Sequence, residues 1–374
     1  MNNTNINDRH TVQIFDYCAD GAGVARLGNG CVVFVEKAVR GDICEIIITK
    51  ILKNVCHAVI GKIIKPSEHR IAVDCPYYDS GEAGASDSAT RLCGGCDFRH
   101  VSYGEELFAK RKRVNDALRR IGGTDIEAGD ILTTGKIIGY RNNIQLKTDG
   151  KNIGFYSGKS HDIINIDYCF LAGEEMNKEI KQGVSRIRTS VEKIGDLTFK
   201  ISPESFFQVN SEAALLLYEK AREYADLKPH EFLLDLYCGT GSTTLFLARN
   251  AGRALGVELS AAAVADAKEN AALNNIGNVD FLCADVSLLE TGGLAPDCIV
   301  IDPPRKGLAP GALKKTEELA PARIIYISCN PATLARDIKL LHNYEVKQIS
   351  AVDMFPRTKH IECVAKLERK KGAL

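Results

Sequence analysis

Long apolar runs are missing from this sequence of 374 residues. No stretch is apolar over the roughly 20 residues that a membrane-spanning helix needs, and the first residues do not resemble a secretory signal peptide. A surplus of charge is missing as well, because 48 basic side chains balance 48 acidic ones. We therefore expect a cytoplasmic protein without a membrane partner, in which any nucleic acid binds to local basic patches.

A disulfide framework is not expected either, although the chain contains 13 cysteines. Their number is odd and they are scattered over the whole length, which favours thiols and metal ligands in a reducing compartment. The sequence also lacks long internal repeats and low-complexity tracts. At this length, the chain can form two or three domains with at least one large core.

Three segments differ in their pattern. Residues 11–64 alternate short β-like runs with glycine turns, which predicts a small β-barrel that ends near Pro66. Residues 75–200 contain a cysteine-rich loop, a basic helix and a pair of β-hairpins. Residues 205–374 alternate strands and helices, which predicts an α/β fold with an open, doubly wound sheet and a crevice over the strand carboxyl ends. The expected domains are residues 1–66, 67–204 and 205–374.

A basic run at residues 104–122 predicts a helix that is closed by Gly122 and Gly123. Such a run is either a solvated face or a surface that contacts RNA phosphates, and the pattern alone favours neither interpretation. Its basic residues are Lys110, Arg111, Lys112, Arg113, Arg119 and Arg120.

A candidate cofactor pocket follows the first strand of the α/β segment, in "DLYCGTGSTTLFLA". Gly239 and Gly241 let the backbone approach a ligand closely, and Glu258 ends the next strand, where a carboxylate can accept both hydroxyls of a ribose. Asp285 ends the third strand. Each acid alone would suit a solvated strand end, but the ordered set predicts an adenosyl site. The loop lacks the third glycine of a dinucleotide fingerprint and any phosphate-binding lysine, which favours S-adenosylmethionine over NAD or ATP.

Later strand ends supply candidate catalytic groups. In "VIDPPRKG", Asp302 ends the fourth strand, and Arg305 stands where enzymes that methylate exocyclic amines usually have an aromatic residue. Cys329 ends the fifth strand in "YISCNPATLARD", and the Asn-Pro turn that follows favours a functional thiol over a packing cysteine. Glu362 begins the last strand in "DMFPRTKHIECVAKL", where His360 is a second candidate base.

These groups suit the methylation of carbon 5 of a pyrimidine, which is too weak a nucleophile to take a methyl group from a sulfonium directly. A thiolate that adds to carbon 6 produces an enolate that is nucleophilic at carbon 5. A base must then remove the proton from carbon 5 before the thiolate leaves. Cys329 can supply the thiolate, Glu362 the base, and Asp302 a group that stabilises the enolate or binds the pyrimidine edge.

Six motifs resemble those of the RNA uracil-5-methyltransferase family that carries an iron-sulfur cluster: "SFFQVN", "DLYCGTG", "GVE", "DPPRKG", "SCNPATLARD" and "DMFPRTKHIE". The resemblance implies formation of 5-methyluridine in RNA, with 23S rRNA as the first candidate and tRNA as the second. It implies that Cys329 is the nucleophile, that Glu362 is the base and that Phe206 stacks on the uracil. We also expect Arg305 at the substrate, and a monomer. The residues expected to bind S-adenosylmethionine are Gln208, Tyr237, Gly239, Ser242, Glu258, Asp285 and Asp302.

The same resemblance suggests what the first two segments are. The first is similar to a TRAM domain, an RNA-binding β-barrel of the OB type. In the second, Cys93 and Cys96 form a Cys-Gly-Gly-Cys pair, which by itself fits a cluster, a redox pair or half of a zinc site. The resemblance adds Cys75 and Cys169 and favours a 4Fe-4S cluster, with zinc second. The gap from Cys75 to Cys93 is longer than in the family, and the stretch from Cys169 to Gln208 is shorter.

Two rival functions remain compatible with the sequence. RNA cytosine-5 methyltransferases also place a cysteine after the corresponding strand, but they typically have a second one in the fourth-strand motif, and "DPPRKG" has none. A non-catalytic RNA-binding or redox-sensing iron-sulfur protein would not need Cys329, Glu362 and Asp302 together. Uracil methylation accounts for more of these residues than either rival does.

Overall fold

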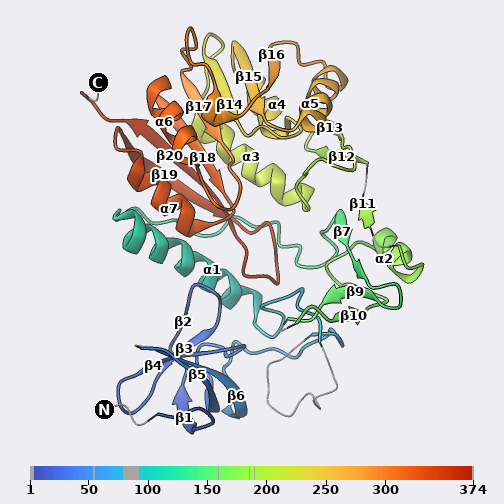
Figure 1. Cartoon of the computed structure of the whole chain (residues 1–374), viewed down its shortest axis with the longest axis vertical. Coiled ribbons are helices and arrows are strands. Elements are labelled where there is room, and N and C mark those ends of the chain that lie inside the picture. Colours follow the sequence, from blue (N-terminus) through green and yellow to red (C-terminus); the bar gives the residue numbers. More distant parts are fainter. Residues whose placement is uncertain are drawn as a thin grey trace. The chain divides into compact units, whose positions relative to one another are not determined.

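The computed structural model describes side chains and backbone at residues 4–53, 55–78, 92–158, 160–184 and 190–372, and the backbone alone at 186–188. The chain divides into two compact units, each built from separate stretches of sequence (Figure 1). Unit 1 comprises Met1–Arg113, Ile144–Ile187 and Phe355–Lys359, and unit 2 comprises Val114–Asn143, Arg188–Met354 and His360–Leu374. The division into three domains stays a prediction. None of the described helices is both long and apolar enough to cross a membrane.

Unit 1 begins with a six-stranded sheet in the order β1-β5-β6-β4-β3-β2. Its residues alternate between buried and more exposed positions along β5 and β6, so that one face forms an apolar core around Val33, Ile46 and Ile60. This sheet is compatible with the expected β-barrel, and its assignment as a TRAM domain stays a prediction. The strands are β1 (Arg9–Gln13), β2 (Asp16–Tyr17), β3 (Gly23–Arg26), β4 (Val32–Val35), β5 (Ile43–Ile51) and β6 (Val55–Lys65).

The predicted basic helix is present as α1 (Tyr103–Ala117), which continues into one π-helical turn, η1 (Leu118–Gly122). Gly123 closes it in the left-handed conformation, with a φ of 65° that suits glycine. Residues 79–91, which make up most of the long gap between Cys75 and Cys93, lie outside the described residues.

The pair of β-hairpins predicted at residues 140–169 is present as two consecutive antiparallel strand pairs. Strands β8 (Lys147–Thr148), β9 (Ile153–Tyr156) and β10 (Ile163–Asn165) form an antiparallel sheet, but β7 (Asn143–Gln145) pairs with β11 (Arg186–Arg188) instead of β8. The physical reason is that only Leu146 separates β7 from β8, and one residue cannot form a hairpin turn. The side chain of Leu146 enters an apolar cluster with residues of α2 (Glu174–Lys181).

Unit 2 contains the predicted α/β sheet, in the order β16-β15-β14-β17-β18-β20-β19. Strands β14 to β18 pair in parallel, and β20 pairs antiparallel with both of its neighbours. The strands are β14 (Phe232–Leu236), β15 (Arg253–Glu258), β16 (Val279–Cys283), β17 (Cys298–Ile301), β18 (Arg323–Ser328), β19 (Tyr344–Val352) and β20 (Glu362–Arg369). A separate hairpin joins β12 (Val191–Ile194) and β13 (Leu197–Lys200).

Helices and short loops connect these strands. Every residue of β14 and β17 is buried, which requires cover on both faces of the sheet because side chains alternate between the faces. Strand β14 has β15 as its neighbour on one side and β17 on the other, so the order of the strands reverses at β14. In open α/β sheets the ligand crevice lies at such a point, here at the carboxyl ends of β14 and β17. The helices are α3 (Ser211–Ala225), α4 (Ser242–Ala248), α5 (Ala261–Leu273), η2 (Val286–Leu288), α6 (Pro310–Leu319) and α7 (Pro331–Leu340).

Candidate functional site

The loop after β14 bends back over β15 at the predicted cofactor pocket. Tyr237, Gly239 and Gly241 all have positive φ values, of 68°, 54° and 80°. The backbone N–H of Tyr237 donates to the carbonyl of Val257 at 2.9 Å. A Cβ atom on Gly241 would lie 3.0 Å from the ring of Phe281. A larger residue there would push the loop away from the sheet, so this glycine is required both for its backbone conformation and for its packing.

Glu258 and Asp285 follow the next two strands, as the sequence predicts. Oε2 of Glu258 accepts a hydrogen bond from the backbone N–H of Gly239 at 3.2 Å, which ties the end of β15 to the glycine loop. Asp285 is exposed and begins η2. The pKa of Tyr237 is raised to about 12, chiefly by burial and then by the carboxylates of Asp285, Asp337 and Glu258. The structure therefore brings Tyr237, Gly239, Glu258 and Asp285 together at one edge of the sheet.

The remaining cofactor and substrate candidates lie near this edge or point to solvent. Oγ of Ser242, at the start of α4, lies 2.9 Å from the hydroxyl oxygen of Tyr218 on α3. The buried Gln208 is held through its carbonyl, which accepts from Nδ2 of Asn142 at 3.1 Å. Phe206 is 72% exposed, so its ring is available to a ligand without any rearrangement of a core.

Cys329 and Glu362 come together because of one strand pairing. In the antiparallel pair of β18 and β20, Ser328 lies opposite Cys363, and the next positions along the two strands are Cys329 and Glu362. Side chains at directly opposed positions point to the same face of a sheet. Asp302 directly follows the neighbouring strand β17, and its N–H donates to the carbonyl of Leu236 at 3.3 Å.

The ionisation of these three groups is coupled. The pKa of Cys329 is raised to about 11, chiefly by burial and then by the carboxylate of Glu362, while the guanidinium of Arg305 acts in the opposite direction. Burial, reinforced by Asp302, also raises the pKa of Glu362 well above its ordinary value. Burial raises the pKa of Asp302 to about 7. A thiol, a buried carboxyl group that can hold a proton and a second carboxyl group therefore share one environment.

Arg305 and His360 form a second pair beside this environment. Nη2 of Arg305 lies 2.6 Å from Nδ1 of His360, so the arginine occupies one of the two ring nitrogens that could accept a proton. The carbonyl of Arg305 accepts hydrogen bonds from Nδ2 of Asn330 and Oγ1 of Thr333, at 3.2 and 3.3 Å. These contacts favour Glu362 over His360 as the base.

Asp337 is a residue that sequence reasoning missed. Its buried Oδ2 accepts from the hydroxyl of Tyr326 at 2.6 Å and from the N–H of Leu308 at 2.7 Å. A Cβ atom on Gly307, which has a φ of 75°, would collide with the same carboxylate. Asp337, which lies on α7, therefore connects the loop after β17 with β18 through these two hydrogen bonds. The available signal was its place in "SCNPATLARD", eight residues after the strand-end cysteine.

The four cysteines predicted to bind a cluster are all in unit 1 and are half-buried. After burial, the neighbouring thiols of Cys169 and Cys75 help to raise the pKa of Cys93 to about 11, and Cys169 does the same for Cys96. A Cβ on Gly94, between these two cysteines, would lie 2.7 Å from Cα of Gly158. The thiols are thus neighbours, but no three of the described Cys, His, Asp or Glu side chains are placed closely enough to hold a metal ion.

The coupling around Cys329 can be tested by alkylation. Because Glu362 raises the pKa of Cys329 and Arg305 lowers it, Glu362→Gln should lower that pKa and Arg305→Met should raise it. The thiolate is the reactive form, so at roughly pH 8 iodoacetamide should modify Cys329 faster in Glu362→Gln and more slowly in Arg305→Met than in the wild type. Peptide mass spectrometry measures the rate, with the exposed Cys283 as internal reference. Equal rates in all three proteins would show that the groups are not coupled.

Known proteins resemble this chain over most of its length. A family model described as tRNA (Uracil-5-)-methyltransferase matches residues 171–291 and 285–370. Proteins of Clostridium tetani and Halalkalibacterium halodurans, each described as an uncharacterized RNA methyltransferase, are 32% and 33% identical to this chain. The matches cover 96% of both chains for the first protein and 98% of both for the second. The first alignment spans 453 positions, so that relative has residues without a counterpart in this chain of 374.

A solved structure is similar over the same extent. It is the Pyrococcus abyssi tRNA (uracil-54, C5)-methyltransferase in complex with S-adenosyl-L-homocysteine, with a TM-score of 0.75 and 27% identity, over 96% of this chain and 100% of that one. The family model covers the glycine loop, the strand end at Cys329 and the start of β20 at Glu362 alike. The resemblance stated from the motifs is therefore confirmed, and the chain belongs to the tRNA (uracil-5-)-methyltransferase family of RNA methyltransferases.

Proposed function

We propose that this protein methylates carbon 5 of a uridine in RNA through a covalent adduct with Cys329, with S-adenosylmethionine as the methyl donor. The observation that carries the proposal is that the pairing of β18 with β20 brings Cys329 and Glu362 close enough to affect each other's charge, near Asp302. This arrangement supplies the nucleophile and the base that pyrimidine methylation needs. The S-adenosyl-L-homocysteine in the Pyrococcus relative supports the choice of donor.

The donor would bind at the loops after β14, β15 and β16. Glu258 retains lone pairs that can accept the two ribose hydroxyls, and Gly239 allows close approach of the backbone. Tyr237 and Asp285 adjoin the same loops. The other residues proposed to complete the site are Gln208, Ser242 and Asp302. When bound, S-adenosylmethionine supplies an electrophilic methyl group.

The residues of the chain would perform three steps. The thiolate of Cys329 adds to carbon 6, and the electrons of the double bond between carbons 5 and 6 move to oxygen 4 as an enolate. Asp302, whose pKa is about 7, is protonated in part at neutral pH and can donate a hydrogen bond to that oxygen. After carbon 5 has taken the methyl group, Glu362 accepts the proton of carbon 5. The double bond then forms again, and the bond between carbon 6 and the sulfur of Cys329 breaks.

The class of RNA is a separate proposal. The motif resemblance favours 23S rRNA, whereas the description of the family model and the Pyrococcus enzyme both name tRNA. Both descriptions name uracil, which favours uridine over cytidine as the target. Mapping 5-methyluridine in rRNA and tRNA from a strain that lacks the gene identifies the substrate, because the modified position disappears.

The covalent mechanism predicts different defects for the nucleophile and the base. Cys329→Ala should bind RNA and S-adenosylmethionine but transfer no methyl group, because no enolate can form. Glu362→Gln should methylate the base and then stall, because the proton on carbon 5 has no acceptor, leaving protein joined to methylated RNA. Denaturing gels show the adduct as a slower band. RNA with 5-fluorouridine should trap the wild type in the same way and should not trap Cys329→Ala.

Two results would contradict this mechanism. Normal methylation by Cys329→Ala would exclude the covalent route. Normal turnover by Glu362→Gln would exclude Glu362 as the base, and His360 would be tested next.

We also propose that Cys75, Cys93, Cys96 and Cys169 hold a 4Fe-4S cluster with a structural role. The proximity of the four thiols and the backbone contact of Gly94 with Gly158 support this proposal. The described structure does not place the thiols at ligand distances, so binding has to draw them together.

Iron analysis tests the cluster. Protein purified without oxygen should be brown and contain about four irons per chain. Cys96→Ser should lose the iron, whereas Cys18→Ser, a half-buried cysteine outside the proposed ligand set, should retain it. Stoichiometric zinc without iron would refute the cluster and favour the zinc alternative.

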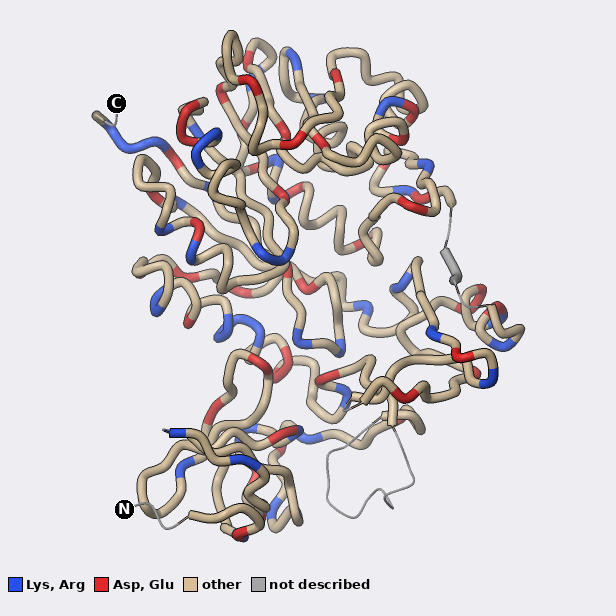
Figure 2. Tube along the Cα trace, viewed as in Figure 1, with Lys and Arg blue, Asp and Glu red and all other residues tan. Residues whose placement is uncertain are grey.

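RNA contact is proposed for the basic helix and the amino-terminal sheet. Basic and acidic residues are interspersed along the described trace, so local groups must provide the contact (Figure 2). Lys110 is buried and Arg113 donates to the carbonyl of Lys359, so neither belongs to a solvated face. Arg119 and Arg120 are 60% and 71% exposed and are the better candidates for phosphates.

Charge reversal tests this surface. The double variant Arg119→Glu and Arg120→Glu should bind RNA more weakly, and its affinity should depend less steeply on salt because fewer counterions are released. Lys314→Glu, at an exposed cation on α6, is the control and should behave like the wild type. Filter binding across a salt series measures both quantities. An unchanged affinity at every salt concentration would mean that this end of the helix does not contact RNA.

A further inference from the structure

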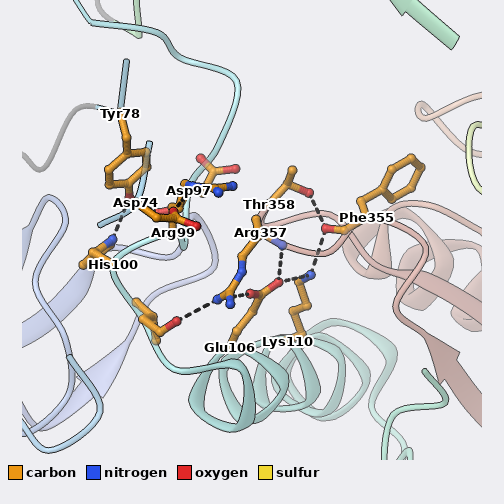
Figure 3. A network of polar contacts seen from close by, with 11 residues as sticks. Asp74, Tyr78, Asp97, Arg99, His100, Glu106, Lys110, Phe355, Arg357 and Thr358 are labelled. Carbon is orange, nitrogen blue, oxygen red and sulfur yellow. Dashed lines mark hydrogen bonds and ion pairs between the residues drawn. The ribbon is translucent and has the colours of Figure 1, made fainter. Parts of the chain in front are cut away.

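A buried network of three charged side chains holds the segment Phe355–Lys359 in unit 1 (Figure 3). Glu106 and Lys110 of α1 and Arg357 of the segment are 0%, 1% and 7% exposed. Oε1 of Glu106 accepts hydrogen bonds from Nζ of Lys110 and from the backbone N–H of Arg357, both at 2.7 Å. Nη1 of Arg357 lies 3.5 Å from Oε2 of Glu106 and donates to the carbonyl of Val101 at 2.8 Å.

Further hydrogen bonds hold both ends and the middle of this segment. The carbonyl of Phe355 accepts from Nζ of the network lysine at 3.1 Å. The carbonyl of Lys359 accepts from Nη1 of Arg113 at 2.7 Å, and its N–H donates to Oδ2 of Asp97 at 3.0 Å. The carbonyl of Arg357 accepts from the N–H of Asp97 at 2.9 Å.

The contacts of this segment carry a cost in free energy, because they bury charged groups and strain the backbone. Burying charged groups is unfavourable unless their geometry satisfies each charge and each hydrogen bond. Arg357 also has a φ of 69°, in the left-handed region that favours glycine. A strained backbone persists only where many surrounding contacts hold it in place. Such strained residues are concentrated at functional sites. Fold stability alone would be served as well by apolar side chains.

We propose that Arg357 is a positioning residue for Glu362, an inference that rests on the proposed function. The chain leaves unit 1 at Lys359, and Glu362 is the third residue after it. Because only two residues separate Lys359 from Glu362, the network would limit the freedom of the chain that enters β20. A base acts only within hydrogen-bond reach of its proton, and a displacement of about 1 Å can slow a reaction about 100-fold. Addition of the thiol and transfer of the methyl group do not need this carboxylate, so only the last step should depend on Arg357.

The experiment separates the last step from the earlier ones. Trapping by RNA with 5-fluorouridine reports on addition and methyl transfer, and steady-state turnover reports on the whole cycle. Arg357→Met should trap at close to the wild-type rate, turn over about 10- to 100-fold more slowly and accumulate methylated adduct, as expected for Glu362→Gln. Arg357→Lys, which retains the cation, should fall between the two. Lys178→Met, which removes an exposed cation of an ion pair in unit 1, is the control and should match the wild type.

The opposite outcomes are equally specific. If trapping and turnover fall together in Arg357→Met and in Glu106→Gln, without adduct, the network only stabilises the fold and the inference is overturned. If Arg357→Met is insoluble, Arg357→Lys and Glu106→Gln decide the question by the same two measurements. If Glu362→Gln accumulates no methylated adduct, Glu362 is not the base and the inference falls, whereas the covalent function itself stands or falls with Cys329→Ala. That result is distinguishable, because it does not involve the Arg357 variants.

Discussion

The antiparallel insertion of β20 between β18 and β19 is the constraint on which the candidate active site depends. In a fully parallel sheet, Glu362 at the start of its strand would lie at the edge opposite the carboxyl end of β18. Because β20 runs the other way, its first residue reaches the edge at which β18 ends, next to Cys329. Burial at this strand pair raises the pKa of both groups. The antiparallel direction of β20 thus accounts both for the proximity of Cys329 and Glu362 and for their raised pKa values.

Two sets of polar contacts hold loops that lie close to candidate catalytic residues in the sequence. Asp337 connects the loop after β17 with β18 and α7 through the N–H of Leu308 and the hydroxyl of Tyr326. Glu106 holds the segment that precedes β20 by a backbone and a side-chain contact with Arg357. Both carboxylates are buried, and both serve several donors. In each case a loop that adjoins a candidate catalytic residue in the sequence is held by a charged group on a helix.

The local pattern predicted the sheet of unit 2 closely, because its strands are buried apolar runs and glycine or proline marks many of their ends. The strand ends at Glu258, Asp285, Asp302 and Cys329 were placed correctly for this reason. The pair of hairpins was predicted correctly, but the pairing of β7 with β11 was not, because strand pairing between distant segments is not visible in local pattern. Asp337 and Arg357 were not recognised as important, because a charged residue in a helix or loop looks solvated until its burial is known.

The sequence by itself determined the chemistry that is available: a strand-end thiol, acids after successive strands, a glycine loop and four cysteines in one segment. These follow from residue type and short-range order, which the chain carries without reference to its fold. Only the tertiary structure decided that Cys329 lies near Glu362, that Arg305 contacts His360 and that Lys110 is buried instead of solvated. Each of these depends on contacts between residues far apart in the chain, whose burial and register are set by packing and not by neighbours in sequence.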